Sequence, residues 1–531
     1  LGPKSDNKLS ILENYKIDVD VNLKNDEGLT ALQIAAEFGF LEVVEILMKR
    51  GAEADIVDPR GNNPLHFASM LWIDNRTIIK LFIDKDVDVN VQNKNGLTPL
   101  HLACKQCNFW NTEVLLECNA CVDVVDEDNN SALHYASLST SDKLNITKLL
   151  IHKGVNVNVQ NRNGTTALQL ACENGNSGIA KMLLENDSDI NLVDNECNNA
   201  LHYVFKSRQN RLHLIKLLID NGIYVNGQNK NGTSPLQLAS KFGDYEAVKE
   251  LLDCNASIDV VDDVNDNSLH YAAVSWKCNK DVIKLLINRG IDVNAQNGNG
   301  TTALHLACEN SDYEVAQKLV ENHACVKILD DDNNTALHYM SKSWKNNQNI
   351  VRLLIGEGLD INSRNSHGTT ALQVACRNCN YHIAGYLLNY GTSVNLLDNN
   401  YNNALHYASK SEHYNADIIK LLAEKFLSVD SQNRNGTTAL QLACQQNNYT
   451  NAEKLLQCGA CVDLVDDKGN NSLHHVAKSR RDSVNVVELL IQAGVDVNAR
   501  NKNGVAALQF ACESCSYEIA KNECDNNAIM H

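Results

Sequence analysis

Pairs of cysteines separated by two residues are the first feature of this sequence that could do chemistry. Thiolates at this spacing are typical zinc ligands, and two such pairs together would complete a tetrahedral site. The pairs at 104/107 and 118/121 have this arrangement, and further pairs lie at 376/379, 458/461 and 512/515. Taken alone, the first two pairs indicate a zinc site.

A recurring phrase offers a different reason for where these residues lie. Gly-Thr-Thr-Ala-Leu-Gln occurs at 164–169, 368–373 and 436–441, and its leucine recurs in fifteen units. Successive leucines lie alternately 33 and 35 residues apart, so the true period is a pair of 68 residues. A fixed period of this kind is typical of a repeat architecture. The leucines are Leu32, Leu65, Leu100, Leu133, Leu168, Leu201, Leu236, Leu269, Leu304, Leu337, Leu372, Leu405, Leu440, Leu473 and Leu508.

Each unit is expected to contain two short helices and a loop. In residues 168–172 small and large apolar side chains share one face at helical spacing, and Ile179, Met182 and Leu183 repeat the pattern. Residues 189–194 then form an extended loop, followed by Asn and Gly residues that favour a turn. A helix pair this short cannot bury its apolar faces alone, so neighbouring units must stack. The sequence therefore predicts an all-α repeat solenoid.

The repeated phrase resembles the ankyrin repeat. Gly-Leu-Thr-Pro-Leu-His-Leu-Ala at 96–103 and Gly-Val-Asp-Val-Asn at 494–498 carry the resemblance, which covers roughly residues 10 to 521. It implies about fifteen stacked repeats in a curved superhelix, each with two antiparallel helices and a hairpin finger, and a concave face for binding. The proline that usually begins the first helix is kept only as Pro64, Pro99 and Pro235. Ala or Ser mostly replaces it elsewhere, which that position tolerates.

The repeat also accounts for most of the cysteines and histidines. Six cysteines occupy one slot, at which the ankyrin pattern has a buried alanine and where Ser240 stands once, and Cys121, Cys325 and Cys461 are assigned to the alanine slot of the Gly-Ala-Asp segment. Buried thiols act as small hydrophobic side chains. A histidine marks every 35-residue unit, and glutamine mostly replaces it in the others with the same expected hydrogen bonds. The six cysteines are Cys104, Cys172, Cys308, Cys376, Cys444 and Cys512, and the histidines are His66, His134, His202, His270, His338, His406 and His474.

Several functions are disfavoured by these patterns. No nucleophile, base and orienting acid stand outside the repeat, and no glycine loop could cradle a phosphate, so we expect no catalysis, no cofactor and no metal. The net charge of −18 argues against direct binding of nucleic acid. No run of 18 apolar residues indicates a membrane span in this region. We expect a cytoplasmic, reducing location, because no apolar leader segment is present.

Charged residues alternate in sign along the expected fingers. Acidic fingers lead into the 35-residue units and basic residues lead into the 33-residue units. Most are expected to form a ladder of surface ion pairs, each worth about 0–1 kcal/mol. The acidic set is Asp123, Asp126, Glu127, Asp128, Asp262, Asp263, Asp330, Asp331, Asp332, Asp466 and Asp467, and the basic set is Lys94, Arg162, Lys230, Arg434 and Lys502.

A second set of charges follows the first helix of each unit. The resemblance places the residue after the Leu-Ala-Cys or Tyr-Ala-Ser segment on the concave floor, and from 342 to 478 this residue is basic in four of five units. Such a stripe, framed by acidic fingers, would attract an acidic or mixed-charge protein segment. A solvated helix face is the alternative interpretation. The predicted binding residues are Lys206, Lys241, Lys342, Arg377, Lys410 and Lys478.

The tryptophans concentrate where the 35-residue units carry their two extra residues, between the two helices. Trp72, Trp276 and Trp344 occupy that turn, and Trp110 is assigned to the equivalent turn of a shorter unit. We expect each ring to fold back over the end of a neighbouring helix. Partner binding is the alternative, because tryptophan is enriched at interface hot spots. Trp72, Trp276 and Trp344 are therefore candidate binding residues too.

The ends of the array define the expected domain organisation. Residues 1–7 are interpreted as a disordered end or a remnant of expression, and residues 8–27 as a partial repeat with its exit loop. Residues 28–521 form the ankyrin array, and residues 522–531 a polar cap or tail. The truncated first unit suggests that more repeats or another domain precede it in the parent protein.

The predicted function is a non-catalytic scaffold that captures a partner protein on its concave face. Heavy use of Asn, Lys and Ile fits an AT-rich genome. On that basis the chain is similar to the ankyrin-rich effectors that endosymbionts and parasites direct at host proteins, in the host cytoplasm or nucleus. Two alternatives are the ankyrin portion of a secreted latrotoxin-like toxin and a structural ankyrin array that tethers membrane proteins.

Overall fold

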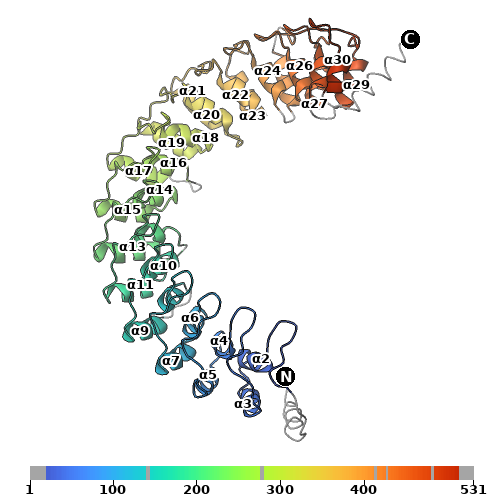
Figure 1. The fold of residues 1–531 in the computed structure, drawn as a ribbon. Helices are drawn as coiled ribbons and strands as arrows, with labels where there is room; N and C mark the ends of the chain where they lie inside the picture. Colours follow the sequence, from blue (N-terminus) through green and yellow to red (C-terminus); the bar gives the residue numbers. More distant parts are fainter. Residues whose placement is uncertain are drawn as a thin grey trace, which may run out of the picture. The chain divides into compact units, whose positions relative to one another are not determined.

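Short helices joined by loops make up almost all of the structure, a computed structural model (Figure 1). It describes residues 20–138, 144–207, 209–275, 280–411, 415–425, 428–479 and 484–513. Isolated antiparallel β-bridges, such as Val125 with Ser131 and Arg364 with Thr370, close several of the loops, and the described residues contain no longer strand. These loops are the predicted fingers. The all-α repeat architecture is therefore confirmed.

The first helix of each unit, here called the inner helix, contains the repeated leucine. The inner helices are five to seven residues long. They are α2 (Ala31–Glu37), α4 (Pro64–Ser69), α6 (Pro99–Lys105), α8 (Ala132–Ser137), α10 (Ala167–Glu173), α12 (Ala200–Val204), α14 (Pro235–Lys241), α16 (Ser268–Ala273), α18 (Ala303–Glu309), α20 (Ala336–Lys342), α22 (Ala371–Arg377), α24 (Ala404–Lys410), α26 (Ala439–Gln445), α28 (Ser472–Ala477) and α30 (Ala507–Glu513).

The second helix of each unit, here called the outer helix, is slightly longer. The outer helices have eight to ten residues. They are α3 (Leu41–Lys49), α5 (Arg76–Ile83), α7 (Phe109–Glu117), α9 (Leu144–His152), α11 (Ser177–Leu184), α13 (Arg211–Asp220), α15 (Tyr245–Asp253), α17 (Lys280–Asn288), α19 (Tyr313–Glu321), α21 (Gln348–Gly356), α23 (Tyr381–Asn389), α25 (Ala416–Ala423), α27 (Tyr449–Gln457) and α29 (Val484–Gln492).

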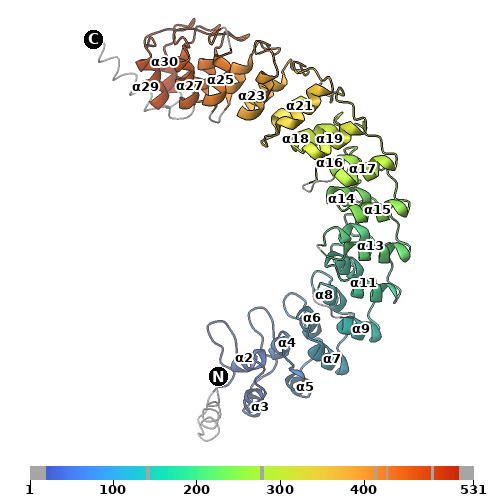
Figure 2. The same ribbon diagram turned by 180° about the vertical axis from the view of Figure 1, so that it is seen from behind.

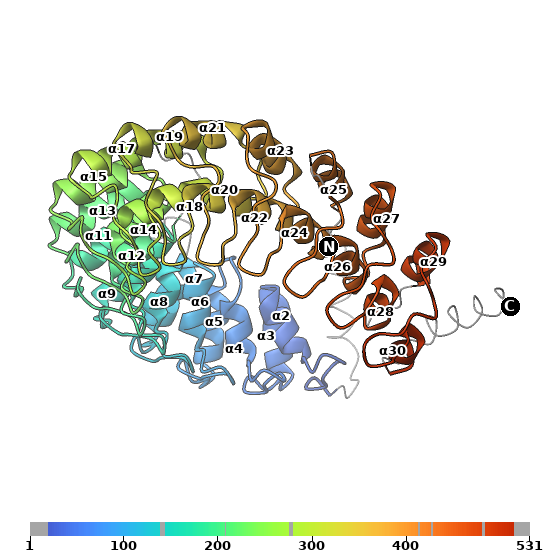
Figure 3. The same ribbon diagram turned by 90° about the horizontal axis from the view of Figure 1, so that it is seen from above.

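The helices pack in two rows within each of two large compact parts of the chain, called the first and second compact units to distinguish them from the 33- and 35-residue repeat units. The first unit comprises residues 1–239 and 244–263, and the second comprises residues 240–243 and 264–531. In the first unit each inner helix from α2 to α12 contacts the next inner helix, and each outer helix contacts the next outer helix (Figure 2). The second unit repeats this from α16 to α30 and from α17 to α29 (Figure 3). Isolated helices shorter than about 12 residues are marginal in water, so stacking stabilises them.

Most inner helices begin at a reciprocal pair of hydrogen bonds between two side chains and the backbone. In α10 the Thr166 N–H donates to Oε1 of Gln169 (2.8 Å), and the Gln169 N–H donates to Oγ1 of Thr166 (3.3 Å). In α8 the Ser131 N–H donates to Nδ1 of His134 (3.1 Å). This capping box satisfies N–H groups that the helix itself leaves unpaired. It explains why Ala or Ser can replace proline at the start of these helices.

The same histidine or glutamine also binds the following finger. Nε2 of His134 lies 3.0 Å from the carbonyl oxygen of Thr165, 31 residues further along the chain. Nε2 of Gln169 donates to the carbonyl oxygens of Leu192 (2.9 Å) and Asn198 (3.1 Å). The predicted equivalence of glutamine and histidine is confirmed. Similar contacts 31 residues apart join His66 to Leu97, His202 to Thr233, His270 to Thr301, His338 to Thr369, His406 to Thr437 and His474 to Val505.

Glycine allows neighbouring fingers to approach one another closely. Gly164 has φ +74°, and a Cβ atom there would lie 2.7 Å from the backbone nitrogen of Asn195. That nitrogen donates to the carbonyl oxygen of Asn163 (2.9 Å) in the preceding finger. A side chain would therefore both strain the backbone and separate two bonded fingers.

The main cysteine slot is buried, as predicted, but a second prediction is wrong. Cys104, Cys172, Cys308, Cys376 and Cys444 have no exposed surface, and neither does Ser240. Burial raises the pKa of the Cys104 and Cys172 thiols to about 12. By contrast Cys121, Cys325 and Cys461 are exposed, because Ala120, Ala324 and Ala460 fill the slot one residue earlier. Cys512 is also exposed, on α30, beyond which no described helix packs.

This difference predicts two classes of thiol reactivity. We expect Cys121, Cys325 and Cys461 to react with a thiol reagent in the native protein, because the thiolate is the nucleophile and these side chains are accessible. Cys172 and Cys444 should react only after unfolding. Timed alkylation followed by peptide mass spectrometry measures both classes. Equal protection of Cys121 and Cys172 would contradict the assigned register.

The buried histidines predict a stability that depends on pH. Burial lowers the pKa of His66, His101 and His305 from 6.5 to about 4. Between these values the unfolded chain binds protons that the native chain does not. The free energy of unfolding should therefore be highest above pH 6.5. It should decrease as the pH falls toward 4, by up to about 3 kcal/mol per histidine.

Urea unfolding followed by circular dichroism at several pH values measures this effect. His101→Gln together with His305→Gln introduces the residue that most other 33-residue units carry at this position. The double variant should fold and lose less stability on acidification than the parent. An identical pH dependence would show that these two side chains do not titrate as inferred.

Candidate functional site

The predicted basic residues all lie at the ends of inner helices. Lys342, Arg377 and Lys410 are the last residues of α20, α22 and α24, and Lys241 is the last residue of α14. Lys478 follows α28 directly and Lys206 follows α12 by two residues. All six side chains are exposed. We call the surface formed by these helix ends, within each unit, the inner-helix face.

The structure brings three of the six residues together. Lys342, Arg377 and Lys410 lie on three successive inner helices of the second unit, which pack against one another. Gln445, at the end of α26, separates them from Lys478. Lys206 belongs to the first compact unit.

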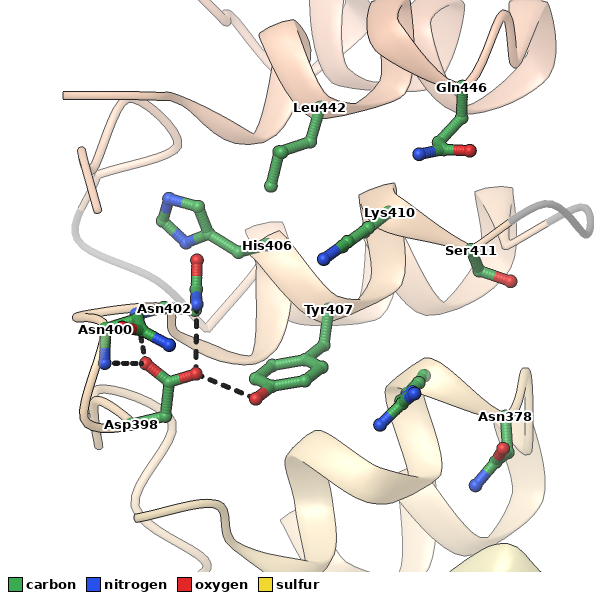
Figure 4. Close-up of a pocket in the computed structure, with 11 residues that line it drawn as sticks. Asn378, Asp398, Asn400, Asn402, His406, Tyr407, Lys410, Ser411, Leu442 and Gln446 are labelled. Atoms are coloured by element: carbon green, nitrogen blue, oxygen red, sulfur yellow. Dashed lines mark hydrogen bonds between the residues drawn. The ribbon is translucent and has the colours of Figure 1, made fainter. Parts of the chain in front are cut away.

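An open groove of about 640 Å³ lies between Arg377 and Lys410. Side chains of α22, α24 and α26 and of the finger before α24 form its walls, and Lys410 and Tyr407 extend toward the same space (Figure 4). The residues that line it are Arg377, Asn378, Asp398, Asn400, Asn402, His406, Tyr407, Lys410, Ser411, Leu442 and Gln446.

A buried carboxylate fixes one wall of this groove. Oη of Tyr407 donates to Oδ2 of Asp398 (2.7 Å), which also accepts from Nδ2 of Asn402 (2.9 Å). The Asn400 and Asn402 N–H groups donate to Oδ1 at 2.8 Å each. Burial tends to raise the pKa of Asp398, but these hydrogen bonds outweigh it and leave the pKa below its ordinary value. Asp398 is therefore ionised. Because it is only 4% exposed, a ligand in the groove does not contact its carboxylate directly.

Burial also sets the protonation of the two ring side chains in the groove. It raises the pKa of Tyr407 to about 12, with the hydrogen bond to Asp398 acting in the same direction, so the phenol keeps its proton. Burial lowers the pKa of His406 below its ordinary value, so the imidazole is neutral at pH 7. The charges that a ligand meets here are consequently those of Arg377 and Lys410, with Asp398 behind them.

The tyrosine–aspartate pair recurs and was missed from the sequence. Tyr203 donates to Asp194 (2.7 Å) and Tyr339 donates to Asp330 (2.8 Å), and Tyr135 pairs with Asp126. The prediction of a surface ladder is wrong for four aspartates of the acidic set, because Asp126, Asp262, Asp330 and Asp466 are buried. The available signal was a tyrosine nine residues after the aspartate, repeated with the 68-residue period.

The exposed finger charges do form ion pairs in the first unit. Arg162 lies 3.2 Å from Asp128, and Lys230 lies 3.1 Å from Glu196, each joining one finger to the next. Side chains of all four residues are more than half exposed. Such pairs contribute little stability. The predicted ladder is present only in part: Arg162 pairs with Asp128 as expected, whereas Lys230 pairs with Glu196, which the prediction did not include.

The tryptophan turns differ from the expected packing. Trp72 is 81% exposed and Trp344 is 86% exposed, so neither ring folds back over a neighbouring helix end. Trp110 lies in the first turn of α7 rather than in the preceding turn, and the Arg76 guanidinium lies 4.3 Å from its ring centre. Trp276 lies outside the described residues. Trp72 belongs to the first compact unit and Trp344 to the second.

Within the described ranges, no group of three His, Cys, Asp or Glu side chains could hold a metal ion. No helix in that part of the chain combines the length and the hydrophobicity that crossing a membrane requires.

Comparison with protein families decides the class of the fold. A family model for ankyrin repeats in three copies matches overlapping segments that run from residue 4 to residue 528. The chain belongs to the ankyrin-repeat family. In ankyrin terms the inner helices, outer helices and fingers are the three parts of each repeat, and the fifteen repeated leucines mark one repeat each.

Ankyrin-repeat proteins of different organisms are similar to this chain. An ankyrin repeat protein of Acanthamoeba polyphaga mimivirus is 27% identical over 373 residues, which cover 67% of this chain and 45% of the viral protein. Transient receptor potential cation channel subfamily A member 1 of Homo sapiens is 26% identical, over 83% of this chain and 40% of the channel. The phosphocholine transferase AnkX of Legionella pneumophila is 25% identical, over 48% of this chain and 25% of the transferase. The chain thus spans less than half of the length of each of these relatives.

Proposed function

We propose that this ankyrin array is a non-catalytic scaffold that captures a partner protein through an acidic or mixed-charge segment. The partner binds along the inner-helix face of the second unit, which is the concave face that the ankyrin family implies. The observation that carries the proposal is the run of exposed cations Lys342, Arg377 and Lys410 on three packed inner helices.

The charges of these three cations remain accessible to a ligand, although Asp398 lies behind Arg377 and Lys410. None of the three forms an ion pair with another described residue. Nζ of Lys342 lies 4.3 Å from the centre of the Tyr339 ring, which favours its position through the negative face of the ring without removing its charge. An acidic segment would supply the missing counter-charges, and complementary potential would also increase the rate of association.

A role as a microbial effector that acts on a host protein, in the host cytoplasm or nucleus, is a further part of this proposal. It is supported by the asparagine-, lysine- and isoleucine-rich composition and by relatives from a giant virus and from Legionella pneumophila. The human channel relative supports the alternative of an array attached to a membrane protein. The same binding face serves either role, because both depend on capture of another protein.

Charge reversal tests the binding face. Replacing Lys342, Arg377, Lys410 and Lys478 by Glu should reduce capture of protein partners from a candidate host lysate by about tenfold or more, because attraction becomes repulsion. Circular dichroism should show unchanged helicity, since all four side chains are exposed. Quantitative mass spectrometry of the captured proteins measures the effect.

A matched control carries the same change of charge on the outer helices. Lys284, Arg352, Lys420 and Lys454 lie on α17, α21, α25 and α27 of the second unit, where they are exposed or partly exposed. Their replacement by Glu should leave capture within about twofold of the parent. Equal loss in both variants, or no loss in the first, would overturn the proposed binding face.

A further inference from the structure

The groove between Arg377 and Lys410 differs from its counterparts in other repeats. The groove joins the last residue of a 33-residue unit, a tyrosine of the following unit and a lysine three residues later. Two other repeats have the same tyrosine and lysine, and in both the first residue is an acid: Glu173 precedes Tyr203 and Lys206, and Glu309 precedes Tyr339 and Lys342. Arg377, beside Tyr407 and Lys410, makes this groove doubly basic.

The charge of the groove matches a carboxylate. Arg377 and Lys410 contribute two positive charges and Asp398 contributes one negative charge, so the lining carries a net charge of +1. A singly charged carboxylate neutralises this groove. A phosphate monoester, which carries nearly two negative charges, would leave an excess next to Asp398. The five N–H donors of the arginine also favour a planar carboxylate with two acceptor oxygens.

The spacing of the inner helices sets the spacing of the ligand charges. Packed helices lie about 8–10 Å apart, so the cations at the ends of α20, α22 and α24 recur at about that distance. An extended segment in the polyproline II conformation rises about 3.1 Å per residue and has three residues per turn, so every third side chain faces the same way. Three residues of an extended segment therefore span one repeat, whereas an α-helix would need about six, at 1.5 Å per residue.

We infer that the partner segment is extended, in the polyproline II conformation, and carries Asp or Glu at every third position, with successive carboxylates at Lys342, Arg377 and Lys410 and the central one, beside Arg377, in the groove. This inference rests on the proposed function and names the chemistry that the binding face selects. The run of cations is bounded by Glu309 before Lys342 and by Gln445 after Lys410. Three acidic positions of the partner segment therefore match the three cations.

Two synthetic peptides with the same amino-acid composition but different glutamate spacing test the inferred three-residue spacing of the acidic positions. A fluorescent peptide of about nine residues, with glutamates three apart and serine elsewhere, is compared by fluorescence anisotropy with a peptide that has the same glutamates side by side. The full chain is used at about 0.15 M salt, where charges more than about 8 Å apart are screened. The spaced peptide should bind about fivefold or more tightly than the clustered peptide. A third peptide with one phosphoserine in place of the central glutamate tests the alternative anion.

Two substitutions that the chain already tolerates elsewhere sharpen the test. Arg377→Glu recreates the Glu309–Lys342 arrangement, so it should fold and weaken the spaced peptide about tenfold or more. Glu309→Arg adds a fourth cation to the run and should strengthen binding of a peptide extended by one more spaced glutamate. Arg352→Glu, on outer helix α21, is the matched control and should change neither affinity.

Each remaining outcome overturns the inference. Equal binding of spaced and clustered peptides, or an equal effect of Arg377→Glu and Arg352→Glu, would show attraction by net charge only. Tighter binding of the phosphoserine peptide would overturn the carboxylate assignment. Absence of peptide binding, combined with loss of capture in the fourfold charge-reversal variant, would remove this inference and leave the proposed function in place.

Discussion

The hydrogen bond that joins most inner helices to the finger of the following repeat unit sets the positions of the groups on the inner-helix face. The histidine or glutamine that makes it is also the partner of the helix cap, so one side chain fixes the start of the helix and the distance to the next unit. Because the contact recurs 31 residues ahead in each 35-residue unit, the helix ends recur in a regular row. The position of Arg377 relative to Lys410 is a consequence of that regularity.

The contact between an inner helix and the following finger takes two forms. A histidine reaches one carbonyl oxygen of the next finger, whereas a glutamine such as Gln169 reaches two. The tyrosine–aspartate pair occurs where the finger leads into a 35-residue unit, as in Tyr203 with Asp194 and Tyr407 with Asp398. The alternation of 33 and 35 residues therefore corresponds to alternating finger contacts. It also explains why only alternate spaces between inner helices have a tyrosine wall.

The sequence predicted the parts of this structure that depend on a period, because burial in a stacked repeat is inherited from the slot. Leu168 and Cys172 are buried for that reason. Predictions that depended on a single register position were weaker. Cys121 was assigned to the buried slot that Ala120, the preceding residue, fills, and adjacent residues of a turn can face opposite environments. Asp126 and Trp344 were misjudged because polarity suggests an environment only on average, and hydrogen bonds from Tyr135 and Asn130 make burial of that aspartate favourable. The groove itself required knowledge of which side chains from three units meet.

The basic run on the inner-helix face is not explained by helix stability. A cation at the end of a helix is favoured by the helix dipole, by about 0.3–1 kcal/mol at exposed positions, so lysine there could in principle be only structural. However, Glu173 and Glu309 end the equivalent helices α10 and α18, and these helices have the same length as α22. The fold therefore accepts either charge at this position. The Leu, Ala and Cys positions of the same helices hardly change from one repeat to the next, whereas the last residue changes the sign of its charge. The core therefore constrains those positions and does not constrain the charge of the last residue.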